Sequence, residues 1–220
     1  NELTGEAYAV VDGVDGRVHH CRFSDIDMTG DAALGAIVEL RAWTDRRGRQ
    51  QSSLLTHSDV DLATQERARG ATWLDKQLIA SEPLPLGPGF GSEVEAAKSR
   101  RLEFLERDGL AQRRGDRFAL SRNLLSTLRE RDLADAGAAL SREHGLPYRQ
   151  IRSSGEVSGI YRQRVQLASG RFAMIDDGLG FSLVPWSKPL DRHLGQYVSA
   201  QPRSGGGIEW TLGRSRSIEI

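Results

Sequence analysis

The sequence predicts an α+β fold in which small antiparallel β modules flank a central helical, winged-helix-like module. Apolar residues alternate with a period of two near both ends of the chain, and glycine-containing turns interrupt these stretches. Between residues 61 and 148 the period changes to about 3.6, which is typical of helices. We therefore expect a β module over residues 1–60, a helical winged-helix-like module over 61–148, and a β module with a short helix over 149–220.

The first module contains four predicted strands. Residues 7–11 and 17–23 alternate and are joined by Asp12-Gly13-Val14-Asp15-Gly16, whose glycines suit a tight hairpin turn. Residues 36–43 and 51–56 follow, separated by a polar, arginine-rich turn. We expect the four strands to form one small antiparallel sheet or a partial barrel.

The second module begins with helical spacing over residues 62–78. The proline- and glycine-rich segment 82–89 interrupts it, because neither residue type readily continues a helix. Ser92 is the expected N-cap of the next helix, which should end at Gly109.

A two-stranded hairpin is predicted directly after that helix, over residues 111–120 with its turn at Gly115-Asp116. A helix followed by such a hairpin is typical of a winged-helix module, in which the hairpin forms the wing. Ser121 or Asn123 can cap a further helix, which Gly145 and Pro147 should end.

The third module returns to a period of two. Strands are predicted over residues 161–167, 171–175 and 181–186, a short helix over 188–194 and a last strand over 208–212.

Composition favours a globular, cytoplasmic protein. The 30 basic and 30 acidic residues balance, and the C-terminal third is the most basic part. No apolar run reaches the length of a membrane-spanning helix, so we expect no membrane insertion. The single cysteine, Cys21, fits a reducing compartment, and a chain that begins with Asn1 suggests a fragment of a longer protein.

Three short motifs invite a chemical role, and each has a simpler structural explanation. His19 and His20 are neighbours on a strand and point to opposite faces, so they cannot easily share a metal ion. Asp176-Asp177-Gly178 is ordinary turn chemistry between strands. The glycine-rich stretch 87–91 lacks the Gly-Lys-Ser/Thr ending of a phosphate loop. We predict no catalytic centre, no metal site and no cofactor in this chain.

Arginines beside aromatic residues are the remaining candidates, and phosphate groups are the ligands they suit. The alternative is that they lie on a solvated or protein-binding surface, because Glu103, Glu106 and Asp108 lie nearby in the sequence. The predicted nucleic-acid contacts are Arg100, Arg101, Arg113, Arg114 and Arg117 around the wing and Arg162, Arg164 and Arg171 on the last sheet.

Longer strings carry a family resemblance over nearly the whole chain. They are Gly159–Arg164, Leu167–Phe181, Val184–Trp186, Gly70–Leu78 and Arg122–Arg129. With these strings the chain resembles the C-terminal region, itself of unknown function, of relaxase/mobilisation nuclease proteins from proteobacterial conjugative plasmids and integrative elements.

The resemblance implies a parent that nicks an origin of transfer and carries the single strand through a type IV secretion channel. Such parents use an N-terminal domain with a tyrosine nucleophile and a histidine-bound metal, a pattern that this sequence lacks, so no catalytic residue is carried over. We expect an accessory segment that helps to bind transfer-origin DNA. The alternative is a module that recruits the relaxase to the type IV secretion coupling protein or to relaxosome partners; an independent hydrolase is a third, less favoured hypothesis.

Overall fold

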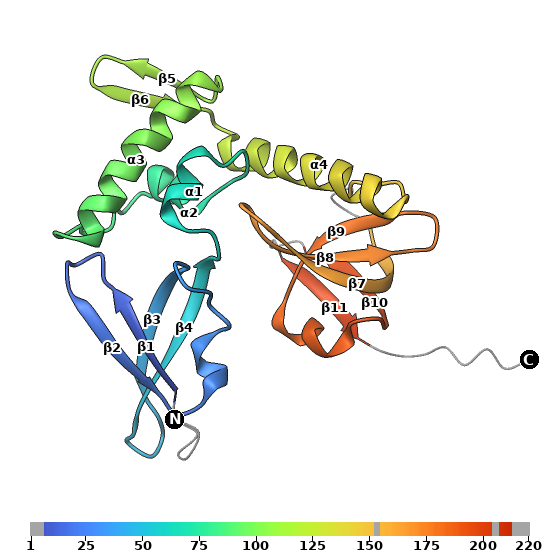
Figure 1. Ribbon diagram of the computed structural model, residues 1–220, viewed down its shortest axis with the longest axis horizontal. Helices are drawn as coiled ribbons and strands as arrows, with labels where there is room; N and C mark the ends of the chain where they lie inside the picture. Colours follow the sequence, from blue (N-terminus) through green and yellow to red (C-terminus); the bar gives the residue numbers. More distant parts are fainter. Residues whose placement is uncertain (1–6, 152–154, 204–206, 213–220) are drawn as a thin grey trace, which may run out of the picture. The chain divides into compact units, whose positions relative to one another are not determined.

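The computed structural model describes residues 7–151, 155–203 and 207–212 (Figure 1). The chain divides into two compact units, Asn1–Thr127 and Leu128–Ile220. Helices and antiparallel ladders make up the structure, so the predicted α+β fold is confirmed. The boundaries at residues 60 and 148 stay predictions, although strands, then helices with one hairpin, then strands follow each other in the expected order.

Two hairpins begin the first unit. Strand β1 (Ala7–Asp12) pairs with β2 (Val18–Phe23), and β3 (Ile37–Thr44) pairs with β4 (Gln50–Ser58). A short 3₁₀-helix, η1 (Ile26–Thr29), lies between the hairpins and was not expected from the sequence.

The four strands form two separate two-stranded sheets, so the prediction of one sheet is wrong. Side chains join the hairpins where a ladder was expected: the Ser52 hydroxyl donates to the Arg22 carbonyl at 2.7 Å. The buried core between the hairpins consists of Ala7, Cys21, Phe23 and Leu54. Face-to-face burial of apolar side chains therefore holds them together.

Three helices follow, as predicted: α1 (Leu62–Arg67), α2 (Trp73–Ile79) and α3 (Phe90–Arg107). Helix α2 begins with a capping box, in which the Thr72 side chain and the Asp75 carboxylate satisfy each other's backbone N–H groups. The shared core contains Ile37, Trp73, Leu74, Val94 and Ala97.

Helix α3 begins two residues earlier than the expected cap at Ser92. Its N-cap is Gly89, with φ of 66° and ψ of −125°, and no side chain caps it. Glycine reaches this backbone conformation without a steric penalty. The early start lets Phe90 pack against the helical core.

The predicted hairpin follows α3 as β5 (Ala111–Arg114) and β6 (Arg117–Leu120). Gly109 has φ of 74° and ends the helix, as expected. Helix α4 (Leu124–His144) comes next and ends before Gly145, whose φ is 68°. Among the described residues, no helix combines the length and the apolar character needed to cross a bilayer.

The second unit contains a five-stranded antiparallel sheet in the order β11-β10-β7-β8-β9 (Figure 1). Its strands are β7 (Val157–Leu167), β8 (Gly170–Asp176), β9 (Phe181–Pro185), β10 (Tyr197–Pro202) and β11 (Ile208–Leu212). Leu133, Ala136 and Leu140 of α4 pack against one face, and Leu190 of the 3₁₀-helix η2 (Lys188–His193) packs against the other.

Strand β10, like η1, was not predicted from the sequence. Val198 and Ala200 are its buried residues, and the polar residues Ser199 and Gln201 separate them from one another and from Pro202. Its place between β11 and β7 comes from long-range pairing, with Val198 opposite Gly159 and Ala200 opposite Val157.

Candidate nucleic-acid interface

The β5–β6 hairpin presents the most basic turn among the predicted sites. Arg114 and Arg117 lie directly opposite each other on either side of Gly115-Asp116, and all four residues are exposed. The buried residues Leu110 and Ala111 anchor the base of the hairpin, and the Leu110 N–H donates to the Leu105 carbonyl at 2.8 Å. The hairpin therefore projects two like charges from a fixed base.

The wing arginines differ in their partners. The Arg113 guanidinium lies 4.7 Å from the centre of the Phe118 ring, and its Nε is 3.8 Å from a Glu106 oxygen. Arg114 makes only a 3.5 Å contact with the Gln112 side chain. In the described part of the chain, no ion pair joins Arg114 or Arg117 to a carboxylate. Like charges placed opposite each other are destabilising, so an anion at this tip would relieve repulsion.

Arg100 and Arg101 are neighbours in sequence but lie in different environments. Arg100 is exposed and its Nη2 lies 2.6 Å from Glu66 Oε1; this hydrogen bond raises the pKa of the Arg100 guanidinium. Arg101 is completely buried and its guanidinium binds both carboxylate oxygens of Asp75 at 2.8 Å. Arg101 therefore cannot contact a DNA phosphate, and this member of the predicted set is corrected.

A sequence signal for the buried position of Arg101 exists. Val94, Ala97 and Leu105 are buried on α3, and Arg101 lies at the same helical face, seven residues after Val94 and four before Leu105. The preceding Thr72-x-x-Asp75 pattern supplies the carboxylate. A charged residue on a buried stripe indicates a buried ion pair more often than a ligand contact.

Arg164 and Arg171 gather on one tryptophan of the second unit. Their guanidinium carbons lie 5.2 and 5.4 Å from the Trp186 ring centre, which is cation–π distance. Arg171 lies beside Trp186 across the β8–β9 ladder, where the backbone N–H of Trp186 donates to the Arg171 carbonyl at 2.9 Å. Arg164 lies opposite the small residue Ala173, and Asp191 is 3.9 Å from its guanidinium. Both arginines were predicted from the sequence, whereas Trp186, their common support, was not among the predicted site residues.

Arg162 lies apart from this pair because a β-bulge interrupts β7. The register passes from Tyr161 opposite Ile175 to Gln163 opposite Met174, which leaves Arg162 as the extra residue. Its Nε donates to Asp176 Oδ2 at 2.9 Å. A hydrogen bond from the Gly178 N–H is the main cause that lowers the pKa of Asp176, and Arg162 adds to it. Within the second unit, Arg162 therefore does not belong to the cluster that Arg164 and Arg171 form on Trp186.

The comparison with known families decides what the chain is related to. A model for proteins of unknown function (DUF3363) matches residues 41–219. The chain belongs to the DUF3363 family. No curated protein and no solved structure matches it.

A surface depression of the DUF3363 chain surrounds Arg162. It has a volume of about 340 Å³ and is lined by Ser158, Gly159, Ile160, Arg162, Asp176, Asp177, Gly178 and Tyr197. Tyr197 is 57% exposed there and was not among the predicted site residues. The two carboxylates at this depression are already engaged, Asp176 with Arg162 and Asp177 with Arg149.

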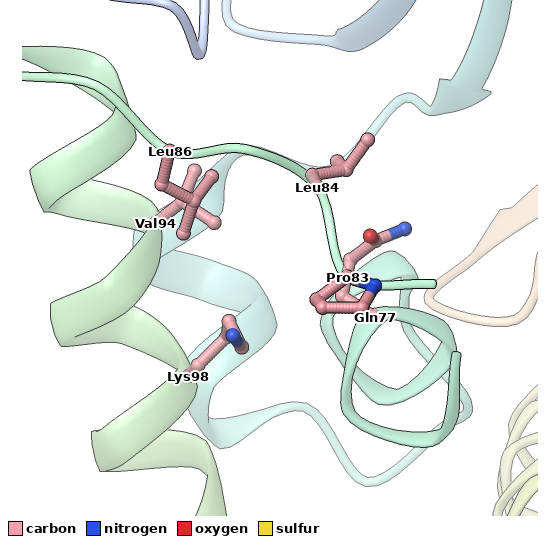
Figure 2. A pocket seen from close by; sticks show the side chains of 6 residues that line it. All are labelled: Gln77, Pro83, Leu84, Leu86, Val94 and Lys98. Carbon is pink, nitrogen blue, oxygen red and sulfur yellow. The ribbon is translucent and has the colours of Figure 1, made fainter. Parts of the chain in front are cut away.

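A second, smaller cavity lies between α2, the proline-rich segment and α3 (Figure 2). In the view of Figure 2, Leu86 and Val94, which belong to one core, lie toward one end, and Gln77 and Pro83 lie toward the other. Its volume of about 10 Å³ holds one water at most. This cavity is part of the helical packing and has no room for an organic ligand.

The motifs with a simpler explanation have local partners. His19 Nε2 lies 3.1 Å from Asp15 Oδ1, beside the first hairpin turn. Asp176 accepts from the Gly178 N–H at 2.8 Å and Asp177 from the Leu179 N–H at 2.9 Å, which confirms the predicted turn chemistry. Within the described ranges of the DUF3363 chain, no group of three metal-ligating side chains comes together.

Proposed function

We propose that this DUF3363 chain is a non-catalytic accessory segment of a conjugative DNA relaxase and helps its parent to hold transfer-origin DNA. The family resemblance of the sequence supports a relaxase as the parent protein, and the basic hairpin supports DNA as the ligand. The nuclease chemistry then belongs to a part of the parent other than this chain. The module formed by α1, α2, α3 and the β5–β6 hairpin acts as a winged helix in this proposal.

The position of Arg114 opposite Arg117 carries the proposal. Two like charges opposite each other on a hairpin disfavour it by roughly 0.2–1 kcal/mol, and within the described residues neither arginine forms an ion pair, although Asp116 lies in the same turn. A phosphate between the two guanidinium groups would replace this repulsion with two charge-assisted contacts. The wing of a winged helix lies beside the phosphate backbone, where such contacts add affinity that depends on salt.

Helix α3 does not read bases in this proposal. Its exposed positions include Glu93, Glu95 and Glu103, which would face phosphates with the wrong sign of charge. Two of its basic side chains have acidic partners, since Arg100 pairs with Glu66 and Lys98 with Glu95. We therefore expect binding that depends on the backbone and tolerates many sequences.

The Arg164–Trp186–Arg171 cluster supplies a second set of phosphate contacts in the proposal. The ring holds both guanidinium groups, so little side-chain entropy is lost when they bind an anion. The Asp191 carboxylate near Arg164 moderates the charge and weakens this site relative to the wing.

The test measures duplex DNA binding by fluorescence anisotropy at several salt concentrations. Combined substitution Arg113→Glu, Arg114→Glu and Arg117→Glu should weaken binding and lower the salt slope by about one for each lost phosphate contact. Arg17→Glu, Arg67→Glu and Arg192→Glu change the net charge equally at exposed positions elsewhere and serve as the control. Equal affinity and slope for the two triple variants would overturn the proposal.

Recruitment to a secretion coupling protein or to relaxosome partners is the second candidate, and the paired charges of α3 favour it. Alternating acids and bases on an exposed helix suit a protein surface better than a phosphate backbone. A pull-down with purified coupling protein in the absence of DNA tests it. Capture that is lost with Glu93→Lys and Glu103→Lys but kept in the wing variant would select this function.

A further inference from the structure

The β3–β4 hairpin carries an exposed tryptophan close to its tip. Trp43 is 42% exposed, whereas Trp73 is 6% exposed and the indole nitrogens of Trp186 and Trp210 are buried. It lies opposite Gln51, two residues from Arg41 on the same strand, so Trp43 and Arg41 share a face of the hairpin. An indole ring this open to solvent is not needed for the core.

The turn next to Trp43 consists largely of arginines. The Gly48 N–H donates to the Asp45 carbonyl at 2.9 Å, which places Arg46 and Arg47 at the two central positions of a β-turn. Gly48 has φ of 76° and lets the chain return into β4. Both central arginines are therefore exposed at the extreme end of the hairpin.

The only acid of the turn holds its shape. Asp45 Oδ1 accepts from the N–H groups of Arg47 and Arg49 at 2.8 and 2.9 Å, and Oδ2 accepts from Arg49 Nε at 3.0 Å. These hydrogen bonds lower the pKa of Asp45, and the one from the Arg49 backbone N–H has the largest effect. In the described chain, the side chains of Arg46 and Arg47 have no acidic partner. The turn thus carries three guanidinium groups against one carboxylate.

We propose that this tip, defined by Trp43, Arg46, Arg47 and Arg49, binds single-stranded nucleic acid. The exposed indole stacks on an unpaired base, and the two central arginines contact the phosphates on either side of it. Base stacking on aromatic rings together with a basic surface is the general way in which proteins hold single strands. A duplex offers no free base face, so the tip prefers a single strand.

This site is separate from the wing and does not depend on it. Strand β4 runs for nine residues from the tip to Ser58, and α1 begins at Leu62, so the tip lies at the end of the hairpin remote from the helices (Figure 1). The wing would hold the phosphates of a duplex and the tip a displaced strand. Either site can be removed without the other.

The experiment titrates the full chain with an oligothymidylate of roughly 12 nucleotides and follows tryptophan fluorescence and anisotropy. We expect quenching in the unaltered chain, loss of most of it in Trp43→Phe, and at least tenfold weaker binding in Trp43→Ala. Combined Arg46→Glu and Arg47→Glu should weaken binding and reduce its salt slope by one to two. Trp43 is exposed, so thermal unfolding of these variants should match that of the unaltered chain.

Two comparisons make the result decisive. The triple wing variant should keep the quenching and affinity for oligothymidylate, and duplex DNA should compete poorly. Unchanged quenching in Trp43→Phe, or unchanged affinity in both Trp43→Ala and the double arginine variant, would overturn the inference. Loss of duplex binding in the wing variant alone bears only on the proposed function.

Discussion

Arg101 and Asp75 form a completely buried, two-pronged ion pair between α3 and α2. Arg101 Nε donates to Asp75 Oδ1 and Nη2 to Oδ2, each at 2.8 Å, and neither side chain is exposed. Arg101 also donates to the carbonyls of Ala68 and Gly70, and Asp75 accepts from the N–H and hydroxyl of Thr72 at 2.7 and 2.8 Å. All three guanidinium nitrogens and both carboxylate oxygens are thus engaged, which favours tolerance of a buried pair.

Removal of the Arg101 charge should be costly. We expect Arg101→Met to lower the free energy of unfolding by about 3–5 kcal/mol, because Asp75 would remain charged and buried without its partner. The neighbouring Arg100→Ala breaks only an exposed pair with Glu66 and should cost at most about 1 kcal/mol. Urea denaturation of the two variants gives the comparison. Similar small losses in both would contradict the structural role of the pair, and Asp75→Leu combined with Arg101→Met should recover part of the loss.

The resemblance string Gly70–Leu78 contains this pair's acidic half. Thr72 and Asp75 cap α2, and Asp75 then binds Arg101. Within this string, Thr72 and Asp75 therefore have a role in the packing of the helical module. Arg101 was wrongly predicted to contact nucleic acid because its buried partner, Asp75, lies 26 residues earlier in the sequence.

Local sequence patterns predicted most of the helices and strands. The pairing of strands that are distant in sequence could not be predicted in this way. The turn at Gly115-Asp116 fixed the register that places Arg114 opposite Arg117, because a two-residue turn determines its hairpin. The split of the first four strands into two sheets and the insertion of β10 beside β7 depend on contacts distant in sequence. The support of Arg164 and Arg171 by Trp186 has the same origin, since β7, β8 and the residue after β9 contribute to it.

The stability of the second unit should depend on the charge of Asp176. Its pKa is lowered first by the Gly178 N–H and then by Arg162, so its stabilising effect is present above the ordinary aspartate pKa and disappears as the pH falls through the folded-state value. Asp176→Asn should be less stable than the unaltered chain at about pH 7, and the difference should shrink as the pH falls below about 4.

Thermal unfolding across this pH range measures the difference. Arg162→Met removes one of the two groups that lower the pKa of Asp176, so it should reduce the pH dependence of stability only in part. Parallel stability curves for the unaltered chain and Asp176→Asn down to about pH 3 would show that this carboxylate has no part in the acid sensitivity.

Gly159 should tolerate no side chain. A Cβ there would lie 2.3 Å from the Asp176 carbonyl oxygen and 2.7 Å from its carbon, and both are backbone atoms in the neighbouring strand. The strand cannot retreat without breaking the pairing of Ile160 with Asp176. We expect Gly159→Ala to cost at least about 1–3 kcal/mol in urea denaturation. Ser158→Ala is the adjacent control, expected within about 0.5 kcal/mol, and equal stability of the two variants would refute the close approach.

Cys21 should report on the opening of the first two hairpins. The thiol is 6% exposed beside Phe23 and Leu54, and burial raises its pKa, so both access and thiolate content are reduced. We expect a thiol reagent such as 5,5′-dithiobis(2-nitrobenzoic acid) to label the folded chain at least about a hundredfold more slowly than the chain in urea. Because the sequence contains one cysteine, the signal is unambiguous.

Two variants separate opening of this core from local reactivity. Phe23→Ala removes a fully buried ring from the same core, should cost about 3–5 kcal/mol, and should therefore speed labelling strongly. Tyr8→Ala removes a ring that is 61% exposed on β1 and should leave the rate nearly unchanged. If Cys21 in the folded chain reacted as fast as in urea, or if both variants changed the rate alike, the hairpins would not bury the thiol through the packing of Phe23.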